Sequence, residues 1–200
     1  MINRTAFSKP QTFLMTLKYN DIRSYVLTAV FVTLAVSVPW IFHQFHLAGA
    51  TFLPMHIFVL IAGLLFGWRA GLITGLLTPL VSHFISGMPV LNVLPQILIE
   101  LSAYGLIAGI LRQKYNLRPI WALLGAIIGG RLALLLAILV IYLIAEQSYS
   151  PLGLETNPFA SFWSVINQGW PGIVIQLISI PVIVWLVGKF TARDIKGKQA

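Results

Sequence analysis

The chain has 200 residues, of which 58% are hydrophobic and 9% are charged, and its mean hydropathy is +0.89. Soluble domains carry about 25% charged residues, so this composition excludes an ordinary soluble protein and indicates an integral membrane protein. The absence of cysteine excludes disulfides, thiolate metal sites and cysteine nucleophiles. The apolar runs are continuous rather than alternating, which favours an all-α bundle over a closed β-barrel.

Six apolar runs are candidates for membrane-spanning helices, since roughly 20 residues cross about 30 Å of hydrocarbon. The runs are Tyr25–Phe42, Met55–Phe66, Leu72–Ile85, Val93–Leu111, Trp121–Ala145 and Ile166–Val187. The second and third runs are short, and only the sequence GWRAG at 67–71 separates them. They therefore form either one overlong helix or a tight hairpin of two.

The positions of lysine and arginine decide between these alternatives. If the two runs are separate spans, every lysine and arginine except Arg131 falls on one side of the membrane, as cytoplasmic segments require. If they are one span, the basic segments at 112–118 and 189–198 lie opposite the N-terminus. We therefore predict an all-α, integral membrane six-helix bundle with both termini cytoplasmic. The net charge of +8 then follows from topology, and nucleic acid is not an expected partner.

A single transmembrane domain is predicted over residues 1–200. It comprises a cytoplasmic N-terminal segment at 1–23, the six-helix bundle at 24–190 and a cytoplasmic tail at 191–200. No linker or low-complexity tract divides it.

Small residues spaced four apart recur within these runs. Such spacing lets membrane helices approach closely, because lipid gives helices no hydrophobic reason to associate. The glycine series are Gly63, Gly67, Gly71 and Gly75; Gly105 and Gly109; and Gly125 and Gly129. We expect the glycines to pack within the bundle, whereas Ala29 and Thr33 in the first run are candidates for contact with a partner protein.

A polar stripe is predicted in the outer half of the fourth run. Asn92, Gln96 and Glu100 recur every four residues, which places them on one face of a helix. Polar groups facing lipid are costly, so the stripe indicates the wall of a cavity that opens outward. The alternative is that these side chains only bond to neighbouring helices.

Arg131 is the basic residue that the topology leaves within the membrane. At 1.5 Å per residue, Arg131 and Glu100 lie at about the same depth on adjacent antiparallel helices, and we expect them to pair. The pair either fixes helix register or holds a polar ligand. In the second case Gln176, with Asn167 and Trp170 near the outer end of the last run, is expected to complete the site.

A metal site is not expected, because His56 and His83 lack the spacing of known metal motifs. The blander interpretation places both histidines at helix ends near the membrane interface. No cofactor is expected either.

The sequence MHIFVLIAGLLFGWRAGLITGLLTPLVSHFISGMP at 55–89, followed by LPQILIELSAYGLIAGIL at 94–111, resembles the substrate-binding S components of energy-coupling factor (ECF) transporters. The resemblance implies a protein of a prokaryotic cell membrane that captures a vitamin or related micronutrient from outside. It also implies association with a transmembrane coupling protein and two cytoplasmic ATPases. In such proteins an alanine-x-x-x-alanine pattern on the first helix packs on the coupling protein, and Ala29 and Thr33 match it except at the second position.

Two other functions and the identity of the ligand stay open. A solitary ion-coupled carrier could use Glu100 as its proton site, although an inverted repeat is not evident. An intramembrane enzyme would need a nucleophile and base, paired carboxylates or a metal cluster, and only one carboxylate lies deep in the spans. Haem or a corrinoid, folate, riboflavin, pantothenate and a pyrimidine or thiamine precursor are candidate ligands, among which Arg131 favours those with an anionic group.

Overall fold

The computed structural model describes residues 22–44, 49–151, 153–155 and 157–197. Its elements are α1 (Ile22–Gln44), α2 (Gly49–Phe52), α3 (Pro54–Phe66), α4 (Trp68–Ser86), α5 (Leu94–Gln113), α6 (Pro119–Ala145), β1 (Ser148–Ser150), β2 (Gly153–Glu155) and α7 (Pro158–Gly197). Each of the six longer helices overlaps one of the six predicted runs, which confirms the helical membrane fold, although α7 extends beyond its run at both ends. The short helix α2 and the β1–β2 hairpin were not predicted, and most of the predicted N-terminal segment lies outside the described residues.

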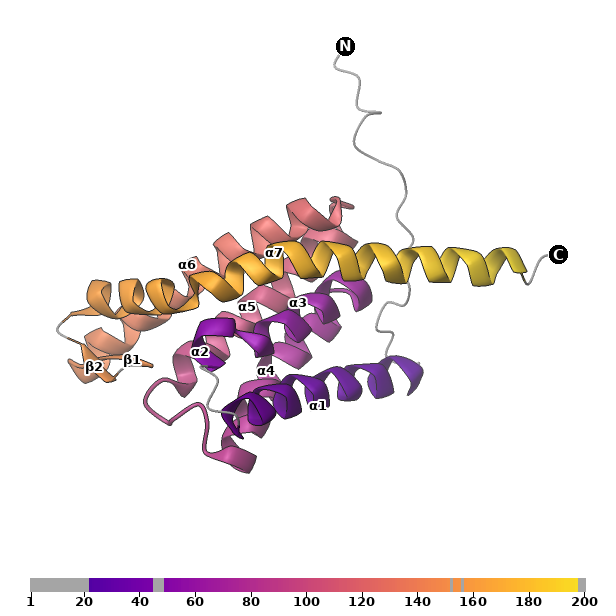
Figure 1. Ribbon diagram of the computed structural model, residues 1–200. Helices are drawn as coiled ribbons and strands as arrows, with labels where there is room; N and C mark the ends of the chain where they lie inside the picture. The colour runs from indigo at the N-terminus through magenta and orange to yellow at the C-terminus, as the bar shows by residue number, and fades with distance from the viewer. Residues whose placement is uncertain (1–21, 45–48, 152, 156, 198–200) are drawn as a thin grey trace, which may run out of the picture.

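The bundle has two chemically distinct ends (Figure 1). The start of α1 and the end of α7 lie at one end, on the right of the figure, and the β1–β2 hairpin lies at the other. The first turn of α4 carries Arg69, and the loop between α5 and α6 carries Lys114 and Arg118, all at the end of the bundle where α7 ends. Glu146 and Glu155 lie at the hairpin end. The arrangement follows the charge asymmetry that the sequence predicts.

Helices α3 and α4 form a tight hairpin rather than one long helix. Gly67 ends α3 and precedes α4, and its positive φ of 87° is a conformation that favours glycine. After this reversal the two helices run side by side, so closely that a Cβ on Gly71 would lie 2.8 Å from the Cα of Gly63. The two-helix interpretation of the 55–85 region is therefore confirmed.

Glycines bring α5 against this hairpin. A Cβ on Gly105 would lie 2.1 Å from the carbonyl oxygen of Gly71, and a Cβ on Gly109 would lie 2.2 Å from the Cα of Trp68. No side chain fits at these positions, so backbone packs on backbone, as membrane helices require for close association. The prediction that the glycines pack within the bundle is confirmed here.

Helix α6 runs antiparallel to α5, and α7 packs against α6, α2 and α3 (Figure 1). The side chain of Ile107 packs against Gly129, and the ring of Tyr104 packs against Gly130. Three described helices are long and apolar enough to cross a membrane: Leu94–Gln113, Pro119–Ala145 and the Pro158–Lys189 part of α7. Tyr25–Ile41 and Pro54–Phe66 are shorter apolar helices.

Candidate functional site

A buried ion pair joins α5 to α6. Arg131 Nη1 lies 2.8 Å from Glu100 Oε1, and the two side chains are 9% and 2% exposed. The predicted pairing of these residues is confirmed. Because an isolated charge in an apolar interior is very costly, each residue compensates the other.

The fold provides room for the guanidinium group of Arg131. A Cβ on Gly169 of α7 would lie 3.1 Å from Arg131 Nη2 and 3.1 Å from Leu53 Cδ1. Neighbouring Gly172 lets α7 approach the backbone of α2, where a Cβ would lie 2.8 Å from the carbonyl oxygen of Thr51. Two glycines of α7 thus let it close over the ion pair and the start of α3.

His56 is the third member of this polar cluster. It lies at the start of α3, with Nε2 3.6 Å from Glu100 Oε2. The ring of His56 also makes an edge-on contact with the ring of Tyr104, with centroids 5.2 Å apart. The 3.6 Å separation is longer than a hydrogen bond. Neither ring nitrogen has a hydrogen-bond partner among the described residues, so the buried imidazole is available to a bound molecule.

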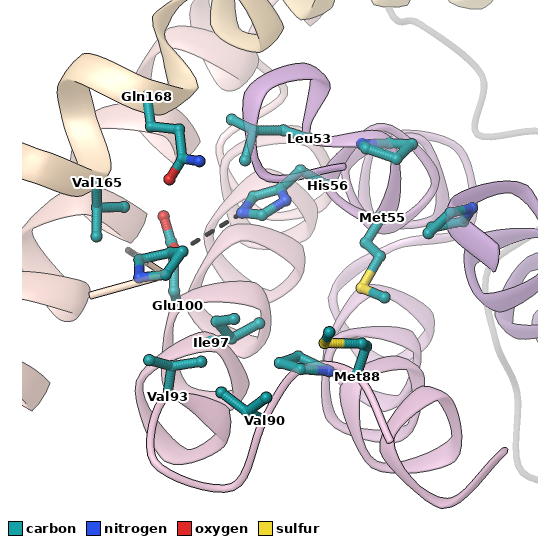
Figure 2. A pocket seen from close by; sticks show the side chains of 14 residues that line it. Leu53, Met55, His56, Met88, Val90, Val93, Ile97, Glu100, Val165 and Gln168 are labelled. Atoms are coloured by element: carbon teal, nitrogen blue, oxygen red, sulfur yellow. Dashed lines mark ion pairs between the residues drawn. The ribbon is translucent and has the colours of Figure 1, made fainter. Parts of the chain in front are cut away.

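A cavity of about 270 Å³ opens beside Glu100 and His56. Its wall is built from the end of α1, the starts of α3 and α5, the α4–α5 loop, the hairpin turn and α7. The lining residues are Pro39, Leu53, Pro54, Met55, His56, Met88, Pro89, Val90, Val93, Ile97, Glu100, Pro151, Val165 and Gln168. Figure 2 shows His56, Glu100 and Gln168 pointing toward one another at one end, with apolar side chains around the rest. An apolar pocket with a few convergent polar groups is the usual form of a small-molecule site.

The structure distributes the remaining predicted site residues over different places. Gln96 is buried, and its Nε2 donates a hydrogen bond to the carbonyl oxygen of Tyr149, 3.2 Å away. Gln176 is fully buried, and neither polar atom of its side chain has a hydrogen-bond partner among the described residues. Neither residue lines the cavity.

Three predicted site residues are exposed. Asn92 lies in the turn before α5 rather than on its helical stripe, because the helix begins only at Leu94 with a proline in its first turn. Asn167 and Trp170 lie well inside α7, which begins earlier than predicted, at Pro158. None of the three lines the cavity, so their role in binding stays a prediction.

His56 and Gln168 line the cavity but were not predicted as site residues. His56 could have been placed by counting from the glycines, because α3 and α5 run parallel and Gly63 packs against Gly105. Going back along both helices from that contact leads to His56 on α3 and to Glu100 on α5. The sequence carries no comparable signal for Gln168.

The two residues predicted to contact a partner lie on the outer face of α1. Ala29 and Thr33 are both exposed, and Thr33 Oγ1 donates a hydrogen bond to the carbonyl oxygen of Ala29 at 2.9 Å. The opposite face of α1 is buried through Val32, Ala35 and Val36. Among the described residues no group of histidine, aspartate and glutamate could hold a metal ion.

Comparison with known proteins identifies the family. The family model described as ECF transporter, substrate-specific component, matches residues 23–184. Searches of the curated proteins and of the solved structures give no significant match. The matched segment contains the ion pair and every residue that lines the cavity. The chain therefore belongs to the substrate-specific components of ECF transporters, multi-pass proteins of the cell membrane that bind a substrate for uptake and are not enzymes.

Proposed function

We propose that the cavity beside Glu100 is the substrate site of this S component, and that the substrate is a vitamin or related micronutrient. The cavity itself carries the proposal, because it joins an apolar enclosure of about 270 Å³ to buried polar groups on three helices. Small-molecule pockets commonly measure about 300–1,000 Å³. The substrate is accordingly small enough to be held largely within the protein.

The position of the cavity supports capture from outside the cell. It lies beside the hairpin turn and the α4–α5 loop, at the end of the bundle that carries Glu146 and Glu155. Lys114 and Arg118 lie at the opposite end. Since cytoplasmic loops are enriched in lysine and arginine, the cavity end faces outward.

Uptake requires an ECF module, with which this family associates. We propose that the module consists of a transmembrane coupling protein and two cytoplasmic ATPases, and that Ala29 and Thr33 contact the coupling protein. The exposure of both residues on a helix whose other face is packed supports this role. Small residues at this place let a partner helix approach the backbone of α1.

Mass spectrometry of the molecules retained by the purified protein tests the substrate site. Ile97→Trp fills the cavity, because Ile97 is half-buried and lies in its wall. The control Ile128→Trp makes the same change on an exposed face of α6. We expect wild type and control to retain a common small molecule that Ile97→Trp loses. If folded Ile97→Trp retains it, the substrate lies elsewhere.

A further inference from the structure

The cavity presents a carboxylate to its contents, whereas the guanidinium group lies behind it. Glu100 lines the cavity and Arg131 does not. Glu100 Oε1 faces Arg131 at 2.8 Å, whereas Oε2 faces His56 at 3.6 Å. Among the described residues, Glu100 is the only acidic or basic side chain other than His56 in the cavity wall. An anionic group in the cavity would therefore meet the carboxylate before it met the arginine.

The polar end of the cavity is rich in hydrogen-bond acceptors. An ionised carboxylate only accepts hydrogen bonds, and each of its oxygens has two lone pairs. Gln168 Oε1 is buried without a hydrogen-bond partner among the described residues, and Figure 2 shows its carboxamide pointing toward Glu100. A neutral imidazole contributes one further acceptor and one donor. The group that satisfies this end is one that donates at least two hydrogen bonds.

The rest of the cavity limits the body of the ligand. Met55, Val93 and Ile97 contribute apolar side chains, and the space measures about 270 Å³. A protein cavity of about 150 Å³ lined by aliphatic and aromatic side chains holds benzene. A substituted ring or two fused rings therefore fit within this cavity, whereas a tetrapyrrole does not.

We propose that the substrate is a compact ring compound carrying an amino group that donates hydrogen bonds to Glu100 Oε2 and Gln168 Oε1. Arg131 acts as a positioning residue, which holds the other oxygen of Glu100 at 2.8 Å and leaves Oε2 toward the cavity. The inference rests on the proposed substrate site. It departs from the sequence-based preference for an anionic ligand, because Arg131 is already paired with Glu100.

Three probes that share one ring system test the proposal: 2-naphthylmethylamine, 2-naphthalenemethanol and 2-naphthoate. Their binding to the protein in lipid nanodiscs is measured by calorimetry at neutral pH. We expect the wild-type protein to bind the amine about tenfold or more tightly than the alcohol, and the carboxylate most weakly. Charge-assisted hydrogen bonds to a buried carboxylate account for the order.

Two kinds of variant distinguish recognition of the amino group from binding in the cavity. Glu100→Gln combined with Arg131→Met removes both buried charges together, and we expect it to reduce the preference for the amine to less than about threefold. Glu146→Gln makes the same change on an exposed carboxylate at the hairpin end, and it should preserve the wild-type order. Ile97→Trp should weaken all three probes, whereas Ile128→Trp should not.

The outcomes are distinguishable. Equal binding of the three probes, tighter binding of the naphthoate, or no saturable binding of the amine overturns the inference. If the probes bind equally, or the naphthoate binds more tightly, and this binding is lost in Ile97→Trp, the proposed substrate site stands without the amino group. Binding that is unchanged in folded Ile97→Trp overturns the substrate site itself. Should Ile97→Trp fail to fold, Val165→Trp narrows the same cavity from α7.

Discussion

The ion pair between Glu100 and Arg131 allows a quantitative test of the buried site. Both side chains are nearly inaccessible, and their charged atoms lie 2.8 Å apart. Removing one member leaves the other charged and uncompensated in an apolar interior, which costs about 3–5 kcal/mol. We therefore expect Glu100→Gln and Arg131→Met each to lower the free energy of unfolding by about that amount.

The double variant should be far more stable than either single variant. With both charges removed, no unpaired ion is left, and replacing a buried ion pair by uncharged residues of similar volume is often neutral. We expect Glu100→Gln combined with Arg131→Met to lie within about 1 kcal/mol of the wild type. The strong non-additivity is the signature of direct coupling between two residues.

The free energy of unfolding is measured by titrating the purified protein in mixed micelles with SDS and following tryptophan fluorescence. Glu146→Gln is the matched control, because Glu146 is exposed, and it should change the stability by less than about 0.5 kcal/mol. Single variants that each cost less than about 1 kcal/mol, or costs that simply add in the double variant, would refute a closed and mutually compensating pair.

Three further predictions concern packing, topology and partnership. Gly105→Ala should lower the free energy of unfolding by about 3 kcal/mol or more, because its Cβ would lie 2.1 Å from the carbonyl oxygen of Gly71. Gly188→Ala is the control, because open space surrounds Gly188, and thermal unfolding should show it to be as stable as the wild type or slightly more stable. Impermeant thiol reagents applied outside whole cells should label Leu154→Cys and not Lys114→Cys; the reverse pattern would invert the bundle. Thr33→Leu should reduce co-purification of the coupling protein without changing thermal stability, and undiminished co-purification would exclude this face of α1.

The helices and the ion pair could be predicted because they depend on local and additive properties of the chain. Apolar run lengths gave the helices, and the distribution of basic residues separated α3 from α4. Glu100 and Arg131 could be paired because each lies a similar number of residues from a basic loop, and the rise per residue converts sequence separation into depth. The 2.8 Å contact between them agrees with that common depth.

A cavity beside Glu100 was predicted, but most of the residues that line it could not be, because the lining depends on how non-adjacent elements meet. Its place on the polar stripe predicted that Gln96 lines the cavity, yet Gln96 donates a hydrogen bond to the carbonyl oxygen of Tyr149, which also accepts one from Ser161 Oγ. That carbonyl belongs to β1, a short strand with no clear sequence signal. The β1–β2 hairpin thus binds the side chain of Gln96, which the helical pattern alone predicts to contact a ligand.

His56 illustrates a second limit of sequence reasoning. Its position at the start of an apolar run is compatible with the membrane interface, where histidines are unremarkable. What buries it beside Glu100 is the close approach of α3 to α5, where a Cβ on Gly63 would lie 2.6 Å from the carbonyl oxygen of Gly105. The alignment of α3 with α5 depends on tertiary packing. The glycine series nevertheless indicates which residues of the two helices meet.

An experimental structure of the wild-type protein with its retained molecule tests the central claim most directly. We predict that the molecule occupies the cavity between α3, α5 and α7, with a nitrogen atom within about 3.2 Å of Glu100 Oε2 and its ring against Ile97 and Val93. A molecule bound elsewhere in the bundle, with this cavity empty or closed, would contradict the account.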